Sequence, residues 1–149
     1  MRIRMFVSRA ERVISVTPER AFDRLADLAS WTSWMPKTFR VVGRNLTKSL
    51  RAGDTFAVKI AHMPVASKLK VSTSDRPREL TWRGGLRGVL AAEHRFLFDP
   101  ESDGTKTRVR SVETWSGALA GLLRRVIDPV ASKVGGQQIE ALARSLEVS

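Results

Sequence analysis

The chain of 149 residues contains no cysteine, no tyrosine and only two histidines, His62 and His94. Without cysteine there is no disulfide bond and no thiolate-bound metal. Without tyrosine, a site built on a phenolic hydroxyl is excluded. Two histidines far apart in the sequence do not form a metal site without further ligands, and no zinc-protease or phosphate-binding glycine motif is found. We therefore expect no metal and no cofactor.

Long apolar runs are also missing. No stretch approaches the roughly 20 apolar residues that a membrane-spanning helix requires. The arginine-containing first residues are not followed by the continuous apolar core of a signal peptide. We expect a cytoplasmic protein that could work at the inner face of a membrane.

Positive charge is in excess, because 26 Lys and Arg oppose 15 Asp and Glu, which gives a net charge of +11. Such a balance attracts nucleic acids, other anions and acidic lipid headgroups. The basic residues are scattered, with no long run and no recognised nucleic-acid-reading motif. We do not expect a nucleic-acid partner, whereas peripheral contact with an acidic membrane stays open. The sequence does not set the oligomeric state.

Hydrophobic periodicity predicts one α+β domain over residues 1–149. A strand is followed by two short helices, six further strand-like segments and a long C-terminal helix that Pro129 and Gly135–Gly136 should kink or break. The sheet would be antiparallel, curved, of about six to seven strands, and wrapped around the last helix with a cavity between them. The strand-like segments are Ile3–Val16, Phe39–Arg44, Asp54–His62, Val65–Thr73, Glu79–Arg83, Val89–Phe98 and Lys106–Trp115.

Four segments in this order resemble one family: VTPERAFDRLADLASWTSWMP, RAGDTFAVKI, ELTWRGG and EHRFLFDPESDGTKTRVRSVETWSG. The chain resembles the START-like, helix-grip superfamily also called SRPBCC, in its polyketide cyclase/dehydrase and lipid-transport branch. The resemblance implies a helix-grip fold that holds a hydrophobic ligand between the sheet and the long helix. Its members include lipid carriers, quinone-binding proteins, hormone receptors and aromatic cyclases, so the fold alone does not define the function.

The hairpin from His94 to Gly117 carries the candidate chemistry. With the arginines of this hairpin facing outward, strand alternation turns His94 and Glu113 inward. Ionisable groups on an apolar face are costly unless they are satisfied, so this pair is the candidate acid and base, or the partner of a polar ligand end. The alternative is structural: Glu113 pairs with an arginine or caps the last helix, and His94 bonds to the backbone.

The candidate ligand-contacting residues lie on the predicted inner face of the sheet, on the second short helix or on the apolar stripe of the last helix. For the tryptophans and His62, ordinary packing or backbone bonding is the alternative. The set is Trp31, Trp34, Phe56, Val58, Ile60, His62, Leu69, Trp82, Phe96, Phe98, Ser111, Trp115, Leu122, Val126 and Val130.

The function expected first is binding or transport of a small hydrophobic ligand, such as a lipid, an isoprenoid or quinone, or a polyketide-like aromatic. The alternative is a cyclase or dehydratase that uses Glu113 and His94 as acid and base. The small polar set and the missing tyrosine favour the carrier.

Overall fold

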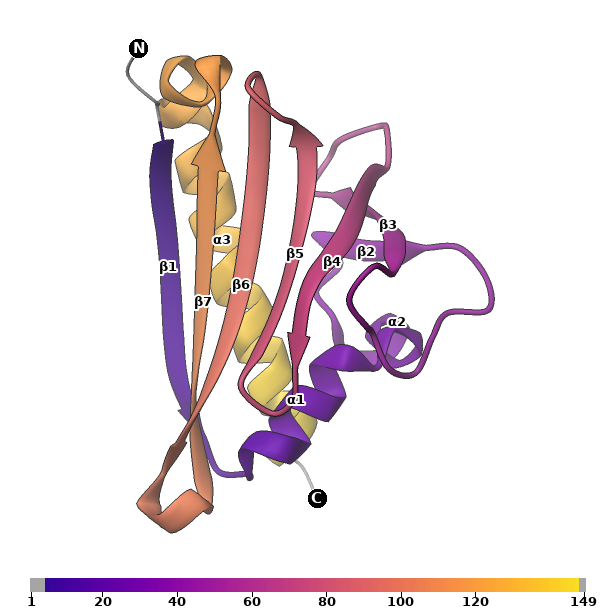
Figure 1. Cartoon of the computed structure of the whole chain (residues 1–149), viewed down its shortest axis with the longest axis vertical. Helices are drawn as coiled ribbons and strands as arrows, with labels where there is room; N and C mark the ends of the chain where they lie inside the picture. The colour runs from indigo at the N-terminus through magenta and orange to yellow at the C-terminus, as the bar shows by residue number, and fades with distance from the viewer. Residues whose placement is uncertain (1–4, 148–149) are drawn as a thin grey trace.

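A seven-stranded antiparallel sheet curls around one long helix, as the computed structural model of residues 5–147 shows (Figure 1). The strand order is β1-β7-β6-β5-β4-β3-β2. The predicted α+β helix-grip fold, with short helices after the first strand, is confirmed. The elements are β1 (Met5–Ile14), α1 (Pro18–Ala26), η1 (Leu28–Ser30), α2 (Trp31–Trp34), β2 (Phe39–Val42), β3 (Thr55–Ile60), β4 (Ser67–Asp75), β5 (Glu79–Leu86), β6 (Leu90–Glu101), η2 (Ser102–Gly104), β7 (Lys106–Ser116) and α3 (Ala118–Glu147).

The two short helices after β1 form where the sequence provides capping residues. The Thr17 side chain accepts a hydrogen bond from the Arg20 backbone N–H, and Pro18 occupies the first position of α1. The indole of Trp31 is buried and donates to the Leu25 carbonyl at 2.9 Å, which ties α2 to α1. These helices therefore close one end of the curled sheet.

Aromatic side chains fill the concave face of the sheet beside α2. Trp82 of β5 lies at the centre, with its ring centroid 5.5 Å from that of Trp31, 5.5 Å from that of Phe56 and 5.2 Å from that of Phe96. All four side chains are buried. Tilted and edge-on contacts at these distances are favourable for aromatic rings beyond the area they bury. This part of the interior is consequently packed core.

The helix α3 is anchored by its second half. From Val134 to Leu146 most of its side chains on the sheet side are buried, whereas in its first half only Ala120 is. Leu122 and Val126 are 72% and 68% exposed. The first half of α3 is therefore held by far less packing than the second.

Of the two predicted effects of Pro129 and Gly135–Gly136, a kink or a break, the break is wrong, because α3 is one continuous helix from Ala118 to Glu147. Pro129 removes one backbone hydrogen bond, and Gly135 and Gly136 weaken helix propensity, but these costs are local. Burial of the apolar side chains that follow outweighs them.

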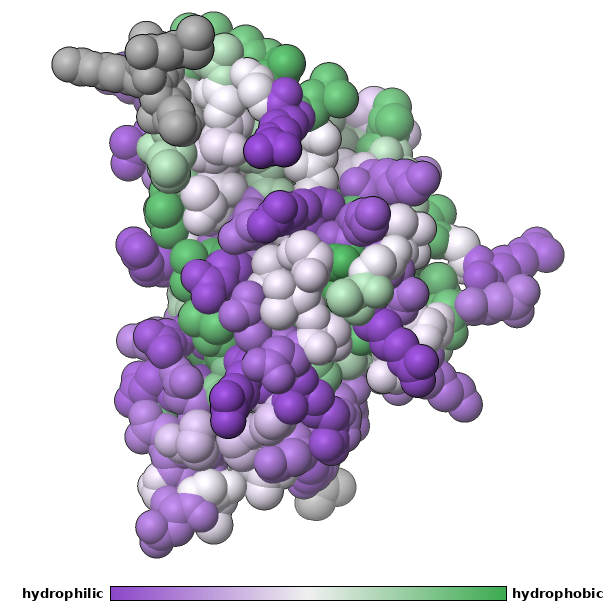
Figure 2. All heavy atoms as spheres, viewed as in Figure 1, coloured by the Kyte–Doolittle hydropathy of each residue, from purple (hydrophilic) through white to green (hydrophobic). Residues whose placement is uncertain are grey.

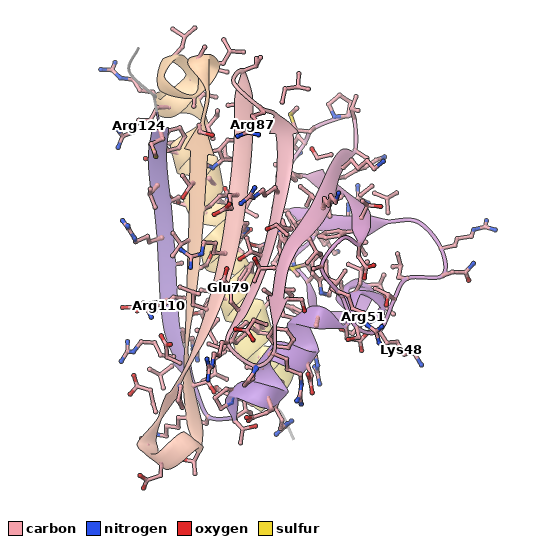
Figure 3. All side chains as sticks on the ribbon, viewed as in Figure 1. Lys48, Arg51, Glu79, Arg87, Arg110 and Arg124 are labelled. Carbon is pink, nitrogen blue, oxygen red and sulfur yellow. The ribbon has the colours of Figure 1, made fainter. Side chains whose placement is uncertain are left out.

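Charged side chains pair across the outer face of the sheet, where Glu79 and Arg110 lie (Figure 3). Glu79 accepts hydrogen bonds from Thr81 at 2.6 Å and from the Arg95 guanidinium at 3.3 Å. Burial raises the pKa of Glu79, but the hydrogen bonds from Thr81 and Arg95 outweigh burial, so that pKa is lowered from its ordinary value.

A lowered pKa in the folded state means that Glu79 stabilises the fold above its unfolded pKa, and that this contribution is lost as pH falls through the folded value. We expect Glu79→Gln to lower the free energy of unfolding by about 0.5–1 kcal/mol at neutral pH. Denaturant unfolding of both proteins from pH 7 to pH 3 should show the difference shrinking below pH 4.5, the ordinary value for this group. A difference that stays constant over this range would contradict the assignment.

Candidate functional site

A buried chain of hydrogen bonds joins β6 to β7 on the side that faces α3. The Nε2 atom of His94 lies 2.6 Å from Oγ of Ser111, and its Nδ1 atom lies 3.2 Å from Oε2 of Glu113. The indole N–H of Trp115 donates to the other carboxylate oxygen of Glu113 at 2.8 Å. We call these four residues the polar network. His94 is 4% exposed and Ser111 3% exposed, whereas Glu113 and Trp115 are half-buried, so the network leads from the interior toward the surface.

The strand register builds this network. In the antiparallel pair β6·β7, His94 is directly opposite Glu113 and Phe96 is opposite Ser111. Residues two apart on a strand share a face, so Ser111, Glu113 and Trp115 all point the same way as His94. A glycine of α3 lies over them: a Cβ at Gly135 would be 3.6 Å from Oγ of Ser111. The sheet supplies the polar groups, and the glycine leaves space above them.

The carboxylate of Glu113 determines how the imidazole of His94 is oriented. An ionised carboxylate only accepts hydrogen bonds, so Nδ1 of His94 carries a proton and donates it to Glu113. In the neutral imidazole Nε2 is then an acceptor, and the Ser111 hydroxyl donates to it. The pair can hold a polar ligand atom or pass a proton. Serine hydrolases also connect a serine, a histidine and a carboxylate by hydrogen bonds in this sequence. Here, however, Ser111 is too deeply buried to meet a substrate carbonyl.

A cavity of about 10 Å³ adjoins the network, enough for about one water molecule. It is much smaller than the cavity we expected between sheet and helix, because aromatic side chains fill the interior around Trp82. Beyond it, the Ser8 and Ser132 hydroxyls are 2.9 Å apart and link β1 to α3. The lining residues of the small cavity are Ser8, Arg9, Ala10, His94, Ser111, Glu113, Ala131, Ser132 and Gly135.

A wider hollow of about 600 Å³ opens between β1 and α3 and meets the small cavity at Ala10 and Ser132. Its rim carries Glu11, Lys133 and other charged side chains. It is open to solvent, and its charged rim does not suit an apolar ligand.

Most of the predicted ligand-contacting residues belong to the packed core. None of them except Ser111 lines the small cavity, and their role toward a ligand stays a prediction. Three of the predicted residues are half-buried: Trp34, Ile60 and Trp115. Eight more are buried: Trp31, Phe56, Val58, Leu69, Trp82, Phe96, Phe98 and Ser111.

The expected inward position of His62 is wrong. Strand β3 ends at Ile60, and Ala61 has a positive φ of 51° that turns the chain. The Met63 N–H then bonds to the Ile60 carbonyl, so His62 lies exposed in the turn. It contacts neither His94 nor the network.

Leu122, Val126 and Val130, the predicted ligand contacts on the apolar stripe of the last helix, are all exposed. Helical spacing places them on one side of α3 but does not show whether the sheet reaches that far. Their part in ligand binding is untested.

Gln138 is a buried polar residue that the sequence reasoning missed. It is 1% exposed, and neither side-chain atom has a hydrogen-bond partner among residues 5–147. Its position four residues after Val134 and four before Leu142, within the apolar stripe of α3, was the available signal. A buried amide without partners costs roughly 1–3 kcal/mol, so it is a natural contact for water or ligand.

Comparison with known proteins places this site in a family. The family model described as "Polyketide cyclase / dehydrase and lipid transport" matches residues 5–148. The chain belongs to this family. The predicted membership is thereby confirmed, and the family and the fold support a function of the ligand-binding or cyclase type. The comparison with curated proteins finds no match.

Solved structures share the fold at low sequence identity. A hypothetical protein, jhp0584, from Helicobacter pylori has a TM-score of 0.72 at 15% identity, over 94% of this chain and 87% of that one. Protein MLL2253 from Mesorhizobium loti has a TM-score of 0.69 at 21% identity, over 97% of each chain. Norcoclaurine synthase from Thalictrum flavum, in complex with dopamine and hydroxybenzaldehyde, has a TM-score of 0.69 at 10% identity, over 99% and 90%. These likenesses establish the fold alone.

None of the helices described among residues 5–147 is long and apolar enough to cross a membrane. No group of three or more His, Asp or Glu side chains in that part of the chain could hold a metal ion.

The hydrogen bonds of His94 lead to a spectroscopic prediction. In the wild type Nδ1 of neutral His94 should carry the proton, because Glu113 only accepts. In Glu113→Gln the new amide can still accept from Trp115 and donate to Nδ1, which moves the proton to Nε2 and toward Ser111. With only two histidines in the chain, ¹⁵N NMR of the imidazoles resolves both, and exposed His62 is the internal control. The same tautomer in both proteins would contradict the proposed geometry.

Proposed function

We propose that this protein binds a small hydrophobic molecule whose polar end contacts the Ser111–His94–Glu113 network. The observation that carries the proposal is the position of this network: it is buried among aromatic side chains, yet it adjoins a cavity under α3. The ligand's apolar body would lie under the first half of α3, which buries few of its own side chains. Lipids, isoprenoids or quinones and polyketide-like aromatics have this combination of one polar end and an apolar body.

Binding requires the part of α3 that covers the small cavity, at Ala131, Ser132 and Gly135, to move away from the sheet, because that cavity holds only about one water molecule. Few side chains of α3 are buried before this part of the helix, so little packing there opposes the movement. Pro129 lacks the N–H that would continue the helical hydrogen bonds, which weakens the helix directly before these residues. The side chains buried from Gln138 to Leu146 keep the fold intact while the helix opens.

The apolar area that such a ligand buries sets the energetic scale. Burying about 400 Å² contributes roughly 10 kcal/mol before association costs of several kcal/mol. The surplus corresponds to weak binding, so the hydrogen bonds of the polar network decide which molecules bind tightly. A ligand without a polar end would leave the network closed on itself and gain nothing from it.

Two neighbouring glycines provide a matched test. Gly135→Ala puts a methyl group 3.6 Å from Ser111, in the space that the ligand's polar end needs, whereas a Cβ at Gly136 meets nothing within 4 Å. Both changes should stabilise α3 by up to about 1 kcal/mol. We expect Gly135→Ala to weaken ligand binding at least tenfold and Gly136→Ala to leave it unchanged.

Native mass spectrometry of the purified wild type identifies any ligand that the protein retains. If none is retained, binding is measured by titrating fatty acids, isoprenoid quinones and aromatic polyketide analogues. Circular dichroism melts confirm that both glycine variants fold. Equal binding by the two variants, or no binding by the wild type of any of these probes, would overturn the proposal.

One observation favours a second function, an acid–base cyclase or dehydratase. The His94 imidazole and the Glu113 carboxylate are in contact at 3.2 Å, the arrangement that positions a base or an acid for proton transfer. General acid–base catalysis contributes typically about 10²–10⁴-fold to a rate. If Glu113→Gln lowers the turnover of cyclisable polyketide substrates by about this factor while substrate binding is retained, the enzymatic function is supported. Unchanged turnover would refute it.

A further inference from the structure

One end of the molecule presents apolar side chains to solvent. The turn between β5 and β6 is hydrogen-bonded to the start of α3, through the N–H of Ala118 to the Gly88 carbonyl at 3.1 Å and the N–H of Leu119 to the Val89 carbonyl at 2.8 Å. These contacts hold together two segments that both expose large apolar residues (Figure 2). We call Leu86, Val89, Leu119, Leu122 and Val126 the apolar end; Leu86 is 69% exposed and Leu122 72% exposed.

The charges around the apolar end have a single sign. Residues 84–92 and 114–127, which form the turn and the first turns of α3, contain three arginines and no Asp or Glu, and the carboxylates that border these ranges, Glu93, Glu113 and Asp128, contact Arg83, His94 and Ser132. Arg87 and Arg124 lie at this end of the molecule (Figure 3). Arg87, Arg124 and Arg125 take part in none of the ion pairs formed among residues 5–147. Other unpaired basic residues lie elsewhere on the protein, so this end is distinguished by unpaired positive charge that lies next to exposed apolar side chains.

From this combination we propose that the apolar end docks on the surface of an anionic lipid bilayer. Its apolar side chains would insert at the boundary between headgroups and acyl chains, and its arginines would contact the anionic headgroups. The proposal goes beyond ligand binding and does not depend on it.

The shape of this end favours a bilayer over a protein partner. The side chains project from a hairpin turn and from the first turns of a helix, and neither hollow described above is lined by them. A fluid bilayer accommodates projecting side chains of any arrangement, whereas a protein partner must match their shape. The absence of carboxylates agrees with an anionic surface and disfavours a basic one.

Vesicle co-sedimentation separates the two contributions. The wild type should bind vesicles of phosphatidylcholine mixed with phosphatidylglycerol, and bind pure phosphatidylcholine vesicles much less. Leu86→Ser combined with Leu122→Ser should weaken binding at least tenfold, because it removes the inserting side chains. Arg87→Gln combined with Arg125→Gln should weaken it about fivefold for each arginine.

A control with the same charge change lies elsewhere in the molecule. Lys48 and Arg51 are exposed in the connection between β2 and β3, away from the apolar end (Figure 3). Lys48→Gln combined with Arg51→Gln should leave vesicle binding nearly unchanged. An equal loss in this control would mean that the net charge of +11 alone attracts the vesicles, and would overturn the proposal.

Two further outcomes are decisive. Vesicle binding retained by the Leu86→Ser, Leu122→Ser variant, with its fold confirmed by circular dichroism, would overturn the docking site. So would light scattering that shows a dimer which this variant dissociates, because the apolar end would then contact a second copy. Gly135→Ala should bind vesicles like the wild type, which keeps a failure of docking distinct from a failure of ligand binding.

Discussion

The register between β6 and β7 is the constraint on which the site depends. It sets His94 directly opposite Glu113 and Ser111 opposite Phe96, so that the hydrogen bonds that build the sheet also position the polar network. A slip by one residue would move all these groups to the outer face, among the arginines, and would expose Phe96 and Phe98. Because both outcomes are costly, the core fixes the register, and the register fixes the chemistry.

Stability and openness are separated along α3. The aromatic side chains around Trp82 and the second half of the helix hold the fold, while the first half buries only Ala120. A buried Ser–His–Glu cluster is tolerable because its members satisfy one another, whereas the unpartnered amide of Gln138 is a standing cost.

Strand alternation was enough to predict the sheet, the long helix and the positions of His94 and Glu113, because period-two burial is a local property of the chain. Strand and helix periodicity gave wrong positions where the three-dimensional packing determines where an element ends or which of its sides is covered. His62 continues the alternation of β3, but the positive φ of Ala61 ends the strand first. Leu122 continues the helical stripe, but the sheet does not cover it. Cavity size depends on how the rings around Trp82 interlock, which no pattern in the sequence encodes.

The family to which this chain belongs serves several functions on one fold, so its particular role depends on features of this chain alone. The polar network lies beneath the middle of α3, at Ala131, Ser132 and Gly135, and the apolar end includes the first turns of the same helix. A water-insoluble molecule leaves a bilayer only at high cost unless its apolar body stays covered. The proposed docking through Leu122 would bring the first half of α3 against the bilayer, so that the proposed ligand could pass under the helix without crossing water. The positions of the apolar end and the polar network on one helix therefore favour a carrier that loads at a membrane.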